Sequence, residues 1–134
     1  MSRIRGIGGI FFKSEQPEAL YAWYEKHLGI AAQGGQGPAF FSWRHMDDPS
    51  KEALTVWSIF PASTKYFEPG NAGFMLNYIV DDLDATLAAL REEGVAVDER
   101  VEEHDYGKFA WIMDPDGNRI ELWQPKSPAN PVPR

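Results

Sequence analysis

Hydrophobic and polar residues alternate on both sides of a short turn near the end of the chain. The segment Tyr106–Pro125 reads YGKFAWIMDPDGNRIELWQP, with large side chains at every second position before and after the run Asp114–Gly117. A period of two in aromatic and β-branched residues is typical of β-strands. Pro115 suits the second position of a type I turn, and Gly117 accepts the positive φ that returns the chain to the sheet. The pattern therefore predicts a β-hairpin over this segment.

The first half of the chain carries one helix pattern between strand patterns. Apolar residues at helical spacing follow Pro17, which suits a first helical turn, and either Ser14 or Gln16 would be the N-cap. Gly29 is suited to a left-handed helix end. The other predicted elements are a buried strand Ile4–Phe12, a weak strand Ile30–Gln36, and strands Pro38–Arg44 and Ala53–Phe60.

The second half repeats these patterns after a linker, residues 61–73, that is rich in Pro, Gly, Ser and Thr. Asp81 or Asp82 is suited to cap a second helix, and Gly94 is suited to end it. The predicted elements are a strand Phe74–Val80, this helix, a strand Val95–Val101, a loop Glu102–Asp105 and the hairpin.

The order strand, helix, three strands thus occurs twice, and the helix-ending glycines recur about half a chain apart. One such half would leave a sheet face uncovered, so we expect the two halves to pack together around a hollow, although the pattern also permits other α+β sheets. We expect one compact domain, made of a module 1–60, the linker 61–73, a module 74–125 and a Pro-rich mobile tail 126–134.

The hairpin also carries a family resemblance. Its D-P-D-G-N-x-x-E-L run, Asp114–Leu122, resembles the last two strands of the vicinal oxygen chelate superfamily, which includes glyoxalases, bleomycin-resistance proteins and extradiol dioxygenases. Trp23-Tyr24 with Leu28-Gly29 at the first helix, and the repeat of element order, extend the resemblance over nearly the whole chain. The resemblance implies an α+β fold of two βαβββ modules in pseudo-twofold repeat, forming a cup-shaped mixed sheet with the helices outside.

The composition of the chain limits the kinds of ligand and binding partner that we expect. The net charge of −7 argues against nucleic acid, because phosphate binding needs a basic face, and it mildly favours neutral or cationic ligands. The chain has no Cys, so disulfides and thiolate metal sites are excluded. No apolar run approaches the roughly 20 residues of a membrane helix, and the first residues do not resemble a signal peptide. We therefore expect a cytoplasmic protein that does not enter a membrane.

Strand parity predicts which side chains face the hollow. In the hairpin, Ile112, Ile120 and Leu122 form a purely aliphatic set that is expected to pack under the helices. The opposite set mixes a carboxylate with large amphipathic side chains, which is typical of a lined pocket. The residues expected to line a ligand site are Phe41, Trp43, Trp57, Met75, Asn77, Trp111, Met113 and Trp123, with Glu121 among them. The alternative for each aromatic residue is that it fills the core.

Glu121 is the only residue with a ligating side chain at the positions that the resemblance assigns to a divalent ion. The corresponding positions on the other three strands are Gly8 or Gly9; Thr55, Val56 or Trp57; and Met75, with Asn77 nearby. Metal sites need several N, O or S ligands. Of the three histidines, His27 lies on the first predicted helix near its terminal glycine, His45 lies in a polar loop where surface exposure is expected, and His104 lies in the loop that enters the hairpin. We therefore expect no metal and no cofactor.

Two functions remain open at this point, apart from an accessory domain that acts through a protein partner. The first is binding of a small apolar or aromatic molecule, cationic ones included, in an aromatic cup, by a homodimer. The second is a lyase, isomerase or dioxygenase-like enzyme, with Glu121 as general base or metal ligand and His104 or Tyr106 as acid. Without a metal, the enzyme would need other electrophilic help, such as Lys108 or Arg119.

Overall fold

The computed structural model describes residues 3–35 and 37–126, which form a seven-stranded mixed sheet with two α-helices. The strands lie in the order β2-β3-β1-β4-β7-β6-β5. The elements are β1 (Ile4–Ser14), α1 (Pro17–Leu28), β2 (Ala39–Arg44), β3 (Glu52–Pro61), β4 (Phe74–Val80), α2 (Leu83–Glu92), β5 (Ala96–His104), β6 (Gly107–Met113) and β7 (Arg119–Pro125). Neither helix is long and apolar enough to span a membrane, as far as the described ranges go.

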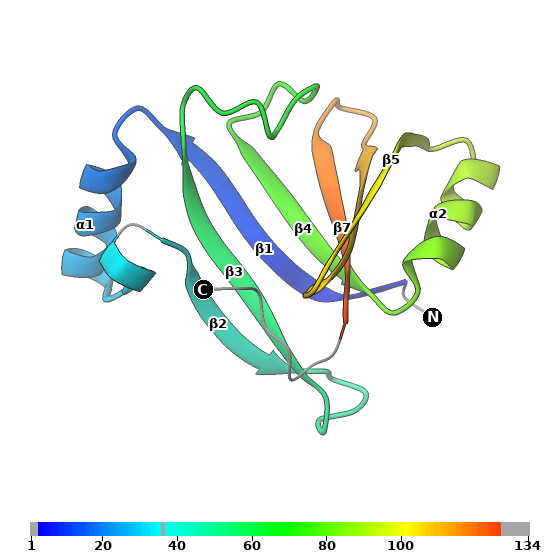
Figure 1. Cartoon of the computed structure of the whole chain (residues 1–134), viewed down its shortest axis with the longest axis horizontal. Coiled ribbons are helices and arrows are strands. Elements are labelled where there is room, and N and C mark those ends of the chain that lie inside the picture. The colour runs from blue at the N-terminus through cyan, green and yellow to red at the C-terminus, as the bar shows by residue number, and fades with distance from the viewer. Residues whose placement is uncertain (1–2, 36, 127–134) are drawn as a thin grey trace.

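Two similar halves meet at the centre of the sheet. β1 and β4 are antiparallel neighbours, and each also pairs in parallel with the last strand of its own half, β1 with β3 and β4 with β7. Figure 1 shows the sheet curved into a cup, with α1 and α2 outside it at opposite ends. The predicted α+β fold, with a repeated arrangement and outer helices, is confirmed.

Two predicted boundaries were wrong. Residues 30–35 of the predicted strand 30–36 do not form a strand, because Gln33–Gly35 makes a 3₁₀ turn in which Gly34 takes a φ of 62°, and residue 36 lies outside the described residues. The first half therefore has two strands after its helix where three were expected. In the second half, β5 continues to His104 through the expected loop, because Glu102 and Glu103 pair with Phe109 and Lys108 of β6.

The predicted turns and caps have clear local causes. The Asp82 carboxylate accepts a hydrogen bond from the Ala85 backbone N–H at 3.0 Å and caps α2. Gly29 ends α1 in the left-handed conformation, with φ 72°. In the hairpin turn, Gly117 has φ 84° and donates its N–H to the Asp114 carbonyl at 3.0 Å. These three sites fix where the elements begin and end.

The convex face of the sheet packs against the two helices. Leu83 and Leu87 of α2 cover Ala110 and Leu122, while Tyr21 of α1 covers the other end of the sheet. The parity predicted for Leu122 and its neighbours Ile112 and Ile120 is therefore confirmed.

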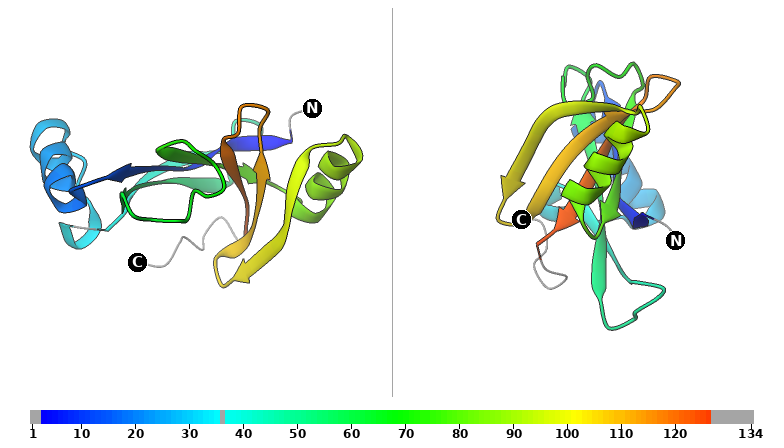
Figure 2. Two further views of the ribbon diagram at one scale, coloured as in Figure 1. Left: turned by 90° about the horizontal axis from the view of Figure 1, so that it is seen from above. Right: turned by 90° about the vertical axis from the view of Figure 1, so that its right-hand side faces the viewer.

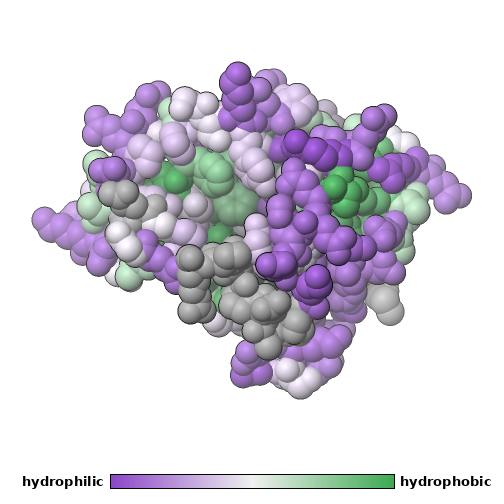
Figure 3. Space-filling model, viewed as in Figure 1, coloured by the Kyte–Doolittle hydropathy of each residue, from purple (hydrophilic) through white to green (hydrophobic). Residues whose placement is uncertain are grey.

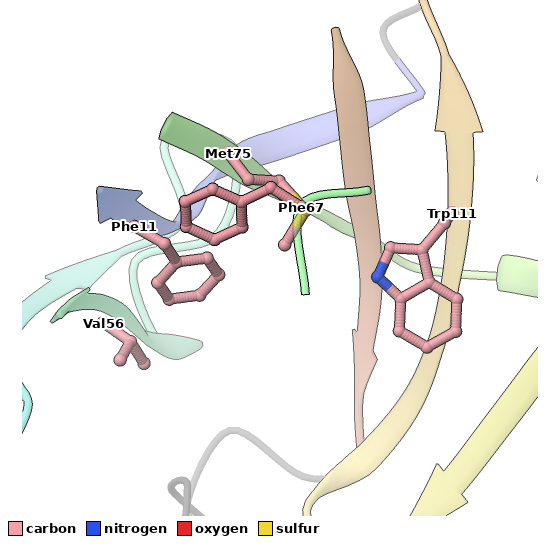
Figure 4. Packing of buried hydrophobic residues seen from close by; sticks show 5 residues of the cluster. All are labelled: Phe11, Val56, Phe67, Met75 and Trp111. Carbon is pink, nitrogen blue, oxygen red and sulfur yellow. The ribbon is translucent and has the colours of Figure 1, made fainter. Parts of the chain in front are cut away.

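The concave face carries a separate core that includes the linker between the halves. Phe67 of the linker is almost fully buried and contacts a cluster from β1, β3, β4 and β6 (Figure 4). The other members of this cluster are Phe11, Val56, Met75 and Trp111. Figure 1 and the view from above in Figure 2 show the linker between the two arms of the cup, near the end of β3 and the start of β7. The linker therefore forms part of the wall of the hollow.

Candidate functional site

A cavity of about 230 Å³ lies on the concave face of the sheet. Figure 3 shows hydrophobic residues in a recess near the middle of this side of the molecule, surrounded by hydrophilic ones. The cavity is lined mainly by aromatic side chains from both arms of the sheet, with glycine and polar residues at its floor. Its lining consists of Gly8, Phe11, Pro38, Val56, Ser58, Phe60, Tyr66, Asn77, Tyr106, Phe109, Glu121 and Trp123.

The carboxylate of Glu121 is the only acidic group in this lining, and its side chain is 2% exposed. Three side chains donate hydrogen bonds to it. Asn77 Nδ2 donates to Oε1 at 2.6 Å, while Trp111 Nε1 donates to Oε2 at 3.0 Å. The Tyr66 hydroxyl also donates to Oε2. Such donors offset much of the free-energy cost of burying a charge.

Burial and hydrogen bonding act on this carboxyl group in opposite directions. Burial raises the pKa of Glu121, and it outweighs the hydrogen bonds from Tyr66, Asn77 and Trp111 and the charge of Arg119, which lower that pKa. Burial also raises the pKa of Tyr66, and the negative charge of Glu121 adds to this effect. The phenol therefore remains a proton-bearing donor over the ordinary pH range.

The register of the sheet places these groups in one row. Val56 pairs with Gly9, Gly9 pairs with Asn77, and Asn77 pairs with Glu121. Trp111 lies opposite Glu121 on β6. Four central strands of the sheet, β3, β1, β4 and β7, thus contribute one residue each to a line across the cavity floor.

Gly8 is required next to this row. A Cβ atom at Gly8 would overlap Asn77 Oδ1 and would lie 2.8 Å from Ile79 Cγ1, which is closer than real Cβ contacts. The absent side chain makes room for the Asn77 amide. Within the described ranges, Asn77 Oδ1 is the only buried side-chain oxygen or nitrogen without a hydrogen-bond partner.

Arg119 attaches the linker to the sheet. Its Nη1 donates a hydrogen bond to the backbone carbonyl of Tyr66. The guanidinium carbon lies 4.8 Å from the ring centroid of Trp111 and 5.7 Å from that of Tyr66, and Nη2 lies 3.8 Å from Asp98 Oδ2. These contacts hold the Tyr66 ring over the Glu121 carboxylate.

The structure places several predicted site residues on the concave face, some of them in the cavity wall. Asn77 and Trp123 line the cavity beside Glu121. Trp111 and Met75 lie behind this wall in the buried cluster. Met113 lines a second hollow with Arg119 and Pro69, away from Glu121.

Two predicted orientations were wrong. Trp57 packs on the convex face against Tyr21, with a ring-centroid separation of 5.8 Å, because the aromatic residues of α1 form a core there. Its neighbours Val56 and Ser58 face the cavity. Phe41 is 46% exposed, and the adjacent Phe40 packs against the concave cluster.

Trp43 lies in the concave core but outside the lining of the cavity. It packs with Trp123, Ile79 and Ala53, and its indole N–H donates to Thr55 Oγ1 at 2.9 Å. Its six-membered ring covers Gly6, where a Cβ atom would collide with it.

The structure does not bring His104 to Glu121. The imidazole is exposed, stacks on Tyr106 with a centroid separation of 5.2 Å, and contacts Glu102 Oε1 through Nε2 at 3.2 Å. Tyr106 lines the cavity in its place. His45, expected at the surface, is buried and stacks on Trp43.

Sequence reasoning missed Tyr66, the most direct neighbour of Glu121. It lies in a segment interpreted as a linker, and strand periodicity assigns no direction to residues outside strands. The only available signal was the pair of large aromatic residues Tyr66-Phe67 in an otherwise polar, Pro- and Gly-containing stretch, which is unusual for a solvent-exposed connection.

The residues at the family's metal positions do not fit a divalent ion. Gly9 and Val56 offer no ligand atom, and Glu121 already accepts hydrogen bonds from three side chains. The described residues contain no group of three His, Cys, Asp or Glu side chains that could hold a metal ion. The donor set amounts to one carboxylate and one amide oxygen, fewer than such ions require.

Several solved structures have a fold similar to that of this chain. The chain is 22% identical to methylmalonyl-CoA epimerase from Mycobacterium tuberculosis, with a TM-score of 0.60 over 93% of this chain and 91% of that one. A methylmalonyl-CoA epimerase from Streptomyces coelicolor, in complex with 2-nitronate-propionyl-CoA, gives 18% identity and a TM-score of 0.66 over 97% and 99% of the two chains. A superfamily member from Vibrio splendidus gives 11% identity and a TM-score of 0.55 over 88% and 97%.

These structural likenesses support the fold alone, and no curated protein matches the sequence. The model of one family, however, covers most of the chain, from the first strand to the last, residues 7–122. The chain therefore belongs to the glyoxalase/bleomycin resistance protein/dioxygenase superfamily.

Proposed function

We propose that the protein binds a small apolar or aromatic molecule in the cavity beside Glu121, without a metal ion. The observation that carries this proposal is a cavity of about 230 Å³ whose walls are aromatic rings and whose one carboxylate is already held by three protein donors. Ligand sites are typically hollows with mostly apolar walls and a few placed polar groups.

The size and shape of the cavity favour a flat ligand. An engineered cavity of about 150 Å³ accommodates benzene, so this cavity suits one to two fused rings. Phe60 of β3 stacks on Tyr66 of the linker with a centroid separation of 5.8 Å, and Phe109 and Trp123 stack at 5.7 Å on the other arm of the cup. Faces and edges of these rings offer favourable contacts to a planar apolar molecule.

Binding of naphthalene-sized aromatic molecules, measured by calorimetry and thermal shift, tests this proposal. We expect binding to be unchanged by EDTA and to weaken at least about fivefold in Phe109→Ala, which removes one wall. The matched control is Trp23→Ala, which removes an aromatic side chain that is 50% exposed on α1, outside the cavity. One tightly held metal ion per chain, with binding lost in EDTA, would contradict the proposal.

A second candidate is a lyase- or isomerase-type enzyme with Glu121 as general base. It is favoured by the raised pKa of Glu121 in a ligand-sized cavity and by the phenol of Tyr66, which could return a proton. The methylmalonyl-CoA epimerases of similar fold are isomerases by name. In this case Glu121→Gln should abolish turnover of a C–H acid substrate while leaving its affinity within about threefold. Ligands recovered unchanged after long incubation would count against this candidate.

A further inference from the structure

Around the cavity, several hydrogen-bond donors already have protein partners, whereas some acceptors do not. The hydroxyl of Tyr66, the amide nitrogen of Asn77 and the indole nitrogen of Trp111 all donate to Glu121. The indole nitrogen of Trp123 donates to the Tyr106 carbonyl at 3.0 Å. Four of the donors in and behind the wall are therefore committed to protein acceptors and are not available to a ligand.

The side chains of Glu121 and Asn77 can still accept further hydrogen bonds. A carboxylate has about four lone-pair sites, and Glu121 Oε2 accepts two hydrogen bonds from the described residues while Oε1 accepts one. The carbonyl oxygen of the neighbouring Asn77 side chain accepts none, although the residue is 1% exposed and lines the cavity. A buried acceptor without a partner carries a desolvation cost that a ligand N–H group can remove.

The charges around the cavity favour a positive ligand. Burial raises the pKa of the Tyr106 hydroxyl in the cavity wall, and the negative charges of Glu121, Glu102 and Asp105 raise it further. Two guanidinium groups lie over the Trp111 ring behind the wall, those of Arg119 and Arg100. Arg119 is engaged by the Tyr66 carbonyl and by Asp98, and Arg100 by Glu102 at 3.5 Å. An anionic ligand would therefore meet the negative charge of Glu121, with the neutral hydroxyls of Tyr106 and Ser58 as side-chain donors in the described lining, whereas a cation would meet acceptors.

Resting on the function proposed above, we propose that the ligand is a flat aromatic amine bound in its protonated form, with its N–H groups directed at Glu121 Oε1 and Asn77 Oδ1. The rings of the cavity hold the aromatic body, and the ammonium lies at the cavity floor next to Glu121 and Asn77. The specificity of the site then depends on the carboxylate and the free amide oxygen, while the aromatic walls determine the size and shape that fit.

Three probes of nearly equal shape separate this inference from the function on which it rests: 1-naphthylmethylamine, its neutral alcohol counterpart 1-naphthalenemethanol, and 1-naphthoate. In calorimetry near pH 7.5 with EDTA, we expect the amine to bind at least about tenfold more tightly than the alcohol, and the carboxylate to bind most weakly. In Glu121→Gln, the advantage of the amine should fall to about threefold or less, with the alcohol unaffected.

A pH titration of the wild type serves if that variant does not fold. The amine stays protonated as the pH is lowered. Its affinity relative to that of the alcohol should therefore decline as Glu121 takes up a proton, while the affinity of the alcohol stays unchanged. Equal binding of amine and alcohol would overturn this inference while leaving the proposed function standing. Failure of all three probes to bind, with the fold intact, would count against the proposed function itself.

Discussion

The phenol of Tyr66 donates a hydrogen bond to the carboxylate of Glu121, across a separation of 55 residues in the chain. One residue lies in the connection between the halves and the other on the last strand. The contact links the two at the wall of the cavity, and Arg119 strengthens the link by binding the Tyr66 carbonyl. The network around the acid therefore depends on a segment outside the sheet.

Removing the hydroxyl of Tyr66 should destabilise the protein. Tyr66→Phe leaves a buried carboxylate with one donor fewer, which costs about 1–3 kcal/mol in the free energy of unfolding at neutral pH. The matched control is Tyr24→Phe on the convex face, where no hydrogen bond of the hydroxyl is seen among the described residues. Urea denaturation of both variants checks this, and an equal loss in the two would contradict it.

The free energy of unfolding should depend on pH through the titration of Glu121. Because burial raises the pKa of this group above its ordinary value of 4.5, the folded state holds its proton more tightly than the unfolded chain. Its contribution is then present below pH 4.5 and is lost as pH rises through the raised pKa. The free energy of unfolding of the wild type relative to Glu121→Gln should therefore fall with rising pH.

Chemical denaturation at several pH values gives that difference directly. The comparison with Glu121→Gln cancels the opposite contribution of other carboxyls such as Asp114, whose pKa is lowered by hydrogen bonds from Asn118. A difference that is flat or that rises with pH would show that the three donors outweigh burial at Glu121.

Gly8 should tolerate no side chain. The methyl group of Gly8→Ala would overlap Asn77 Oδ1 and approach Ile79, so the variant should lose about 1–3 kcal/mol of stability. Gly73→Ala is the control, because a Cβ atom there meets nothing within 4 Å. Thermal unfolding of the two variants checks this prediction, which fails if Gly8→Ala unfolds no earlier than the control.

Trp57 should matter for stability and not for ligand binding. Trp57→Ala opens a cavity against Tyr21 and Tyr24 on the convex face and should cost about 3–5 kcal/mol. Trp23→Ala, at an exposed ring of α1, should cost much less. Urea denaturation measures both. Where Trp57→Ala still folds, naphthalene-sized molecules should bind with near wild-type affinity, and a selective loss of affinity would contradict the orientation described.

The elements that sequence reasoning placed correctly are those with a local cause. The turn before Asn118, the glycine after α1 and the cap at Asp82 each act within a few residues, so the pattern alone predicts them. The parity of the last hairpin was also predictable, because its two sets differ clearly: one is purely aliphatic and the other contains a carboxylate.

The error at Trp57 arose because both faces of β3 are apolar. In β3, Val56 and Trp57 are both buried, so alternation does not tell which one faces the hollow. The Trp57 ring lies on the convex side because it packs there against Tyr21 and Tyr24 of α1. That choice depends on contacts between distant segments, and no local pattern contains it.

The position of Tyr66 in the connection between the halves has a consequence for how members of this fold can diverge. Replacing residues 62–73 with a connection of other length or composition would leave every pairing of the strands intact and yet remove the hydroxyl from Glu121. Selectivity could then change through a segment outside the sheet, while the framework of strands stays the same.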